Sequence, residues 1–78
     1  MDIKRDLISF LCKNFMVEEE EIDLDSSLID QGVIDSFGLI EIATFIEQRF
    51  GIKIQQEQMV RENFGSVHKI VSFVERQL

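Results

Sequence analysis

Residues 35–51 read "DSFGLIEIATFIEQRFG", and this stretch carries the clearest helical pattern in the chain. Its apolar residues recur at intervals of three and four, which places them on one face of a helix. The residues on that face are Leu39, Ile42, Ala43, Ile46 and Phe50. Asp35 suits the capping position before a helix, and Gly51 suits the left-handed position that follows one. The stretch therefore predicts a helix with one face committed to a core.

Two further helices are predicted, one near each end of the chain. The first runs from Ile3 to near Phe15, and Ser66 can cap a last helix. The core face of the first holds Ile3, Leu7, Phe10 and Leu11, with Ile8 and Phe15 beside it. The core face of the last holds Val67, Ile70, Val71, Val74 and Leu78. All three principal helices thus have an apolar face that needs a partner.

The segments between these helices differ in character. Residues 17–35 read "VEEEEIDLDSSLIDQGVID" and show no helical or strand-like spacing of apolar residues, so they predict a long loop. A loop of this length inside a small domain often has a functional role. Its apolar residues can hold it against the core; they are Val17, Ile22, Leu24, Leu28 and Ile29. Residues 52–54 predict an extended connection, and residues 56–62 a helical turn or two with Met59 and Val60 directed inward.

The expected fold is an all-α, small four-helix bundle of three principal helices and one short helix. A long ordered loop joins the first helix to the second, and residues 1–78 form a single domain. The 78-residue chain is 45% hydrophobic, with seven Phe and no Pro, which favours a folded helical protein over a disordered segment.

The charge and the sequence of the N-terminus restrict partners and location. A formal net charge of −7 argues against nucleic acid and anionic membranes as partners and favours basic protein surfaces. The N-terminus has no apolar stretch long enough for a signal peptide or membrane span, so we expect a cytoplasmic protein, and a monomer. The single cysteine, Cys12, is expected to act as a small hydrophobic residue and not in redox chemistry.

The segment "GVIDSFG", residues 32–38, places one polar pair at the start of the central helix. With Asp35 as the cap, Ser36 falls in the first turn and is exposed. A phosphodiester on Ser36 would be tolerated there, because the first amides of a helix are unpaired and the helix dipole favours negative charge.

The face of the same helix that turns away from the core has its own pattern. Phe37 and Ile40 lie on it, and two exposed apolar residues beside a candidate modification site indicate a docking surface. The alternative is that both residues tuck under the long loop. The polar residues of the predicted docking surface are Glu41, Thr44, Glu47 and Gln48.

The sequence argues against two other kinds of site, a serine hydrolase centre and a calcium loop. A hydrolase would need Ser36 as nucleophile with His68 as base, but the chain has no Gly-rich oxyanion loop and His68 fits a surface position better. Asp23, Asp25 and Ser27 match the first places of a calcium loop. Leu28 and Ile34 then stand where that loop needs Gly and a bidentate Glu, so no metal site is predicted.

With these residues in place, the chain resembles the acyl carrier protein family, whose members are also called phosphopantetheine carrier or thiolation domains. The likeness covers nearly the whole chain. The segments that carry it are Gly32-Val33-Ile34-Asp35-Ser36-Phe37, "IEQRFGIKI" from Ile46 and "ENFGSVHKIVSFV" from Glu62.

The resemblance implies that Ser36 receives a 4′-phosphopantetheine arm from coenzyme A, added by a separate phosphopantetheinyl transferase that uses magnesium. It implies that Asp35 helps the transferase and its metal engage the site. The terminal thiol of the arm then holds acyl or aminoacyl groups as thioesters, and the chain itself is not an enzyme. The partners implied are acyl- or aminoacyl-activating ligases or synthases with basic docking surfaces.

Two differences from the housekeeping fatty-acid carriers bear on the pathway that this chain serves. Gly38 stands where housekeeping fatty-acid carriers usually have an acidic residue, and Gln48 and Arg49 dilute the acidic helix end. "DSFG" followed by "IEQRFGI" is similar to D-alanine carriers and to specialised aminoacyl, peptide or polyketide carriers. Fatty-acid and secondary-metabolite biosynthesis both stay open, and the alternative function is a non-carrier, acidic helical interaction module that uses the exposed helix face.

Overall fold

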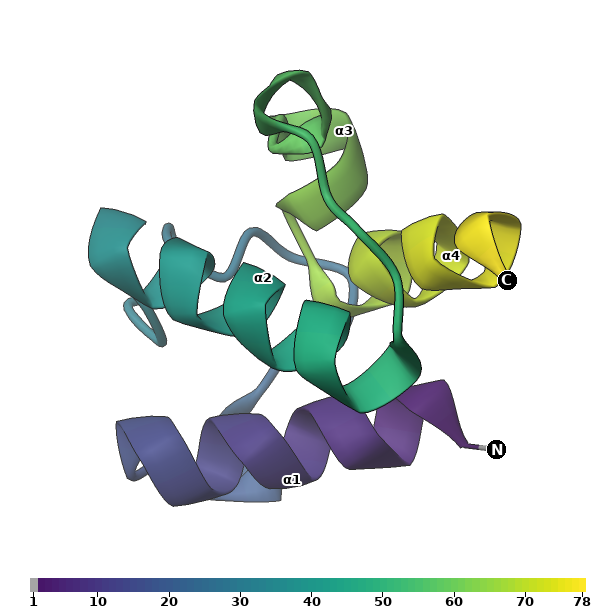
Figure 1. Ribbon diagram of the computed structural model, residues 1–78. Coiled ribbons are helices and arrows are strands. Elements are labelled where there is room, and N and C mark those ends of the chain that lie inside the picture. Colours follow the sequence, from purple (N-terminus) through teal and green to yellow (C-terminus); the bar gives the residue numbers. More distant parts are fainter. Residues whose placement is uncertain (1) are drawn as a thin grey trace.

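The computed structural model describes residues 2–78 and is built from helices and loops (Figure 1). The helices are α1 (Ile3–Phe15), α2 (Ser36–Phe50), α3 (Arg61–Phe64) and α4 (Val67–Gln77), and short 3-10 turns lie at Glu19–Glu21 and Gln56–Gln58. No strand occurs in residues 2–78, which confirms the predicted all-α class. Met1, the first residue of the predicted domain, lies outside the described residues.

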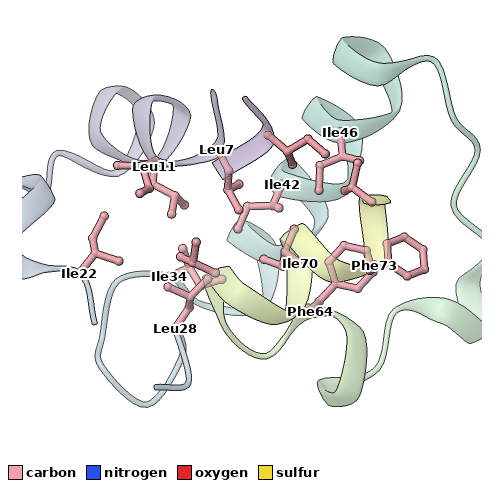
Figure 2. Close-up of a cluster of buried hydrophobic side chains, with 14 of the residues drawn as sticks. Leu7, Leu11, Ile22, Leu28, Ile34, Ile42, Ile46, Phe64, Ile70 and Phe73 are labelled. Carbon is pink, nitrogen blue, oxygen red and sulfur yellow. The ribbon is translucent and has the colours of Figure 1, made fainter. Parts of the chain in front are cut away.

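The helices pack around one hydrophobic cluster. α1 and α2 lie side by side in opposite directions, and α4 closes the bundle (Figure 1). Figure 2 shows side chains from α1, α2, α3, α4 and the first loop converging in this cluster. Those labelled in the figure are Leu7, Leu11, Ile22, Leu28, Ile34, Ile42, Ile46, Phe64, Ile70 and Phe73. Burial of these apolar areas is the main term that stabilises so small a fold.

The long first loop is ordered, as predicted, because it contributes to the core and bonds to the C-terminal part of the chain. Leu28 is fully buried, and its N–H donates to the carbonyl of Gly65 at 2.9 Å. The N–H of His68 donates to the carbonyl of Leu24 at 3.1 Å. These bonds satisfy loop amides and carbonyls that would otherwise lack partners. The loop therefore has a fixed path to the start of α2.

A local hydrogen-bond cluster in this loop gives a pH-dependent contribution to stability. The N–H of Asp25, with the hydroxyl of Ser26, holds the pKa of the Asp23 carboxyl below its usual range. A lowered folded pKa means that the stabilisation is complete above the unfolded pKa and is lost as pH falls through the folded value. We expect the free energy of unfolding to decrease less between pH 5 and pH 3 in Asp23→Ala than in the parent, as measured by urea unfolding. An identical decrease in both proteins would contradict this assignment.

Three expectations about which side chains are buried are wrong. Val60 is 41% exposed and not directed inward, because it is the capping residue of α3. Leu78 is 64% exposed, because α4 ends at Gln77. Ile29 is 43% exposed on the loop surface. The helical turn or two predicted at 56–62 is confirmed, as a 3-10 turn at Gln56–Gln58 and the start of α3 at Arg61.

Gly38 has a packing role that helix propensity alone does not reveal. A Cβ at this position would lie 2.9 Å from Cβ of Ile34 and 2.9 Å from Cε1 of Phe15. Such distances are too short for carbon atoms, so Ile34 or the ring of Phe15 would have to move. The glycine lets the start of α2 approach the end of α1 closely.

We therefore expect Gly38→Ala to destabilise the fold by about 1–2 kcal/mol. Alanine gains about 0.5–1 kcal/mol in helix propensity, but overpacking costs about 1–3 kcal/mol. Urea unfolding measures the difference, with Gln48→Ala at an exposed position of α2 as control. A Gly38→Ala protein that is as stable as the parent would show that Ile34 or Phe15 moves aside without a loss of folding free energy.

Candidate functional site

The start of α2 is positioned by the residues that precede it. Gly32 has a φ of 81°, a left-handed conformation that glycine adopts without strain. This turn directs Val33 and Ile34 into the core, where they are 9% and 6% exposed. Their N–H groups donate to the carbonyl of Leu28 at 3.1 and 3.4 Å. The segment before Asp35 is thus held by both burial and backbone hydrogen bonds.

Asp35 caps α2 as predicted. Its backbone is extended and its carboxylate accepts a hydrogen bond from the N–H of Gly38 at 2.9 Å. Ser36 is the first residue of the 15-residue helix, and its side chain is exposed. The first amides of a helix have no carbonyl partner within it, and the positive end of the helix dipole lies there. The position fits a phosphate ester on the Ser36 hydroxyl sterically and electrostatically.

The exposed face of α2 begins next to this serine. Phe37 is 75% exposed and Ile40 is 55% exposed, so the alternative that both tuck under the loop is wrong. The other residues exposed on this face are Glu41, Thr44 and Gln48. Glu47 lies to the side, half-buried, and its Oε2 accepts a hydrogen bond from the N–H of Ile54 at 2.9 Å. That contact fixes the Glu47 side chain against the connection after α2.

The histidine expected at the surface is exposed, and it pairs with the loop. Nδ1 of His68 contacts the carboxylate of Asp25, a partner that the sequence did not indicate. No hydrogen bond joins His68 to Ser36 in the part of the chain that the structure describes. The geometry gives no support to a serine nucleophile activated by this histidine.

The loop lacks the constellation of a metal centre. Leu28 and Ile34, at the sixth and twelfth places of the calcium-loop match, are 0% and 6% exposed and belong to the core. Within residues 2–78, no group of three or more His, Cys, Asp or Glu side chains is arranged to hold a metal ion. Leu28 and Ile34, which do not fit the calcium-binding pattern, instead hold the loop against the core.

Cys12 is half-buried on α1. Burial raises the pKa of its thiol, and the negative charge of Glu19 raises it further. The thiol is therefore protonated at neutral pH, which agrees with the predicted packing role, since the thiolate is the reactive form.

Gln31 is a positioning residue that sequence reasoning missed. Its Oε1 accepts from the N–H of Asp23 at 2.8 Å, and its Nε2 donates to the carbonyls of Asp23 and Ser26 at 2.9 and 3.1 Å. The side chain thus ties together the loop just before Gly32. A single glutamine among polar loop residues gives no signal of this role, because all its partners are backbone atoms.

The fold and the site together define a small helical domain that presents one serine at a capped helix start. The family model for the phosphopantetheine attachment site matches residues 5–74. Two relatives named D-alanyl carrier protein, from Streptococcus suis (strain 05ZYH33) and Streptococcus sanguinis (strain SK36), are each 34% identical to this chain. Each alignment covers 95% of this chain and 92% of the relative.

The chain therefore belongs to the phosphopantetheine carrier protein family. It is a non-catalytic carrier whose cofactor is covalently attached 4′-phosphopantetheine. The arm supplies a thiol, and the protein supplies tethering and recognition. None of the helices in residues 2–78 has the length and apolar character needed to span a bilayer.

Proposed function

We propose that Ser36 is the attachment residue and that the chain carries acyl or aminoacyl groups as thioesters on the arm. The observation that carries the proposal is the exposed Ser36 hydroxyl at the first position of α2, directly after the capping Asp35. The chain, residues 1–78, acts as one monomeric carrier domain in the cytoplasm. Partner enzymes load and remove the cargo.

Asp35 has two roles in this proposal. Its carboxylate holds the start of α2 through Gly38, and it presents negative charge to the transferase and its magnesium during attachment. The Ser36 oxygen bonds to the phosphorus of the phosphopantetheine group, and the bond from that phosphorus to the 3′,5′-adenosine bisphosphate portion of coenzyme A breaks. The hydroxyl proton of Ser36 is released in the same step. The unpaired amides at the helix start favour the resulting phosphate charge.

The experiment that tests attachment is mass spectrometry of the unmodified protein after incubation with a broad-specificity phosphopantetheinyl transferase, magnesium and coenzyme A. We expect a mass gain equal to one phosphopantetheine group, located by peptide mapping on the segment that contains Ser36. No gain, or a gain on a peptide without Ser36, would contradict the proposal.

The cargo is proposed to be an aminoacyl group, and D-alanine in particular. Two relatives that match along nearly the whole chain are named D-alanyl carriers, and Gly38 replaces the acidic residue usual in fatty-acid carriers. Once the arm is attached, a D-alanine-activating ligase with ATP should load D-alanine faster than L-alanine or a fatty acid. Loading of fatty acids alone would contradict the proposed cargo but not the proposed attachment of phosphopantetheine to Ser36.

Partner enzymes are proposed to dock on the exposed face of α2, which we call the α2 face. Its exposed residues are Phe37, Ile40, Glu41, Thr44 and Gln48, and Glu47 lies half-buried at its edge. Phe37 and Ile40 supply apolar anchors, and Glu41 together with the net charge of −7 attracts basic partners such as the transferase, ligases and synthases.

This docking mode gives a salt-dependence prediction. Because exposed charges are screened, the association rate of the transferase should decrease as NaCl rises from 50 to 500 mM, while dissociation changes less. Stopped-flow fluorescence measures both rates. A constant association rate over this range would exclude electrostatic steering by the acidic surface.

The alternative function predicted from the sequence, a non-carrier interaction module, is at odds with the family match over residues 5–74, and only the 75% exposure of Phe37 favours it. It predicts a partner whose affinity falls in Phe37→Ala and is unchanged in Ser36→Ala, and protein from cells that lacks the arm. Detection of the arm on protein isolated from its own cells would reject it.

A further inference from the structure

Four of the seven phenylalanines lie along the seam between α1 and α2. Phe10 of α1 stacks on Phe45 of α2, with ring centroids 4.3 Å apart and ring planes 18° apart. Phe15 and Phe50 meet this pair edge-on at 6.1 and 6.4 Å. Phe10 and Phe45 are only half-buried, so the stacked pair presents ring surface to solvent.

Two shallow depressions meet at the stacked rings, because Phe10 and Phe45 line both of them. The first, of about 240 Å³, also includes Lys13 and Arg49. The second, of about 320 Å³, also includes Ile40 and Glu41. The rings thus continue the exposed apolar surface of the α2 face across to α1.

Two cations border the rings on this acidic chain. Lys13 lies one turn after Phe10 on α1, so both side chains share one side of the helix. No carboxylate of residues 2–78 lies within ion-pair distance of Lys13. Arg49 pairs with Asp6 at 2.9 Å and its side chain is still 49% exposed. We name Phe10, Lys13, Phe45 and Arg49 the seam patch; Asp6 lines the same depression and compensates Arg49, so the positive charge of the patch is that of Lys13.

We propose that the seam patch binds an amphipathic helix of a partner protein. An apolar stripe on that helix covers Phe10 and Phe45, and a carboxylate beside the stripe pairs with Lys13. The charge of Lys13 selects this occupant, because Asp6 already pairs with Arg49 and a helix with only basic residues would leave Lys13 uncompensated. A second copy of the chain is the other occupant to consider, and mutual repulsion between two chains of charge −7 opposes it.

A partner held on the seam patch leaves the start of α2 accessible. Phe45 follows Ser36 by nine residues, which is about 14 Å along a helix axis. The Ser36 hydroxyl can therefore remain uncovered while the seam patch is occupied, although the seam patch and the α2 face share the depression at Ile40 and Glu41. This surface goes beyond the proposed carrier role and does not depend on Ser36 being modified.

A double-mutant cycle on the full, unmodified chain tests the inference. The probes are two synthetic helical peptides with the same leucine stripe, one with a single Glu beside it and one with Gln at that place. NMR titration should show amide shifts at Phe10, Lys13 and Phe45 on adding the Glu peptide. The Gln peptide should bind the parent about threefold more weakly, and in Lys13→Gln the two peptides should bind equally.

Lys69→Gln, at an exposed position of α4, is the matched control and should keep the threefold difference. Phe10→Leu keeps an apolar side chain and removes the ring stack, and it should weaken both peptides. Equal binding of the two peptides by the parent, or amide shifts confined to other surfaces, would overturn the inference. Concentration-dependent dimerisation with shifts at Phe10 and Phe45 would overturn the proposed occupant in favour of a second copy.

Discussion

Ser36→Ala is expected to abolish attachment of phosphopantetheine and to leave the fold unchanged. The hydroxyl oxygen is the atom that forms the phosphodiester, so its removal leaves the transferase without an acceptor. Ser36 is exposed and makes no capping bond, since Asp35 performs that role through the N–H of Gly38. We expect the free energy of unfolding to change by less than about 0.5 kcal/mol, as is usual for surface substitutions.

The measurement combines mass spectrometry after the transferase reaction with urea unfolding of the same samples. Ser72→Ala is the matched control, because Ser72 is an exposed serine of α4 and lies outside the α2 face. The Ser72 variant should accept the arm at the parent rate. Full loading of Ser36→Ala would move the attachment site elsewhere, and loss of loading in both variants would show that the loss does not depend on the Ser36 hydroxyl.

The predicted helices differ in how well the sequence located them, and the cause is the range of the interactions that define each one. α2 has a full apolar stripe, a capping Asp35 and a terminating Gly51, all of which are local, and the helix ends where these residues indicate. α3 has only four residues. Its position depends on Phe64 packing against Phe73, with ring centroids 5.1 Å apart, which no local pattern reveals.

The candidate site likewise has features that local sequence predicts and features that depend on contacts between distant residues. Helical projection predicted that Phe37 and Ile40 are exposed, and the structure confirms it. Glu47 lies at the edge of the projected face, and its half-buried position depends on a hydrogen bond to Ile54 that the projection does not contain. The hydrogen bonds of the Gln31 side chain to the backbone of Asp23 likewise join residues eight positions apart.

Leu28→Ala is expected to cause the largest loss of stability in the first loop. The side chain is fully buried in the core, and truncation of a buried leucine costs about 3–5 kcal/mol. For a domain of this size each kcal/mol lowers Tm by about 4–8 °C, so thermal unfolding should shift by roughly 12 °C or more. Ile29→Ala is the control, because its neighbouring side chain is 43% exposed and should change stability far less.

The same substitution separates the stability of the loop from the chemistry of the site. The carbonyl of Leu28, which accepts from Val33 and Ile34, and its N–H, which donates to Gly65, belong to the backbone and remain in the alanine variant. Transferase loading should therefore be normal well below the new Tm and fail close to it. Slow loading at low temperature would show that the Leu28 side chain itself positions Ser36. A small Tm change in Leu28→Ala, equal to that of Ile29→Ala, would show that other contacts hold the loop in place.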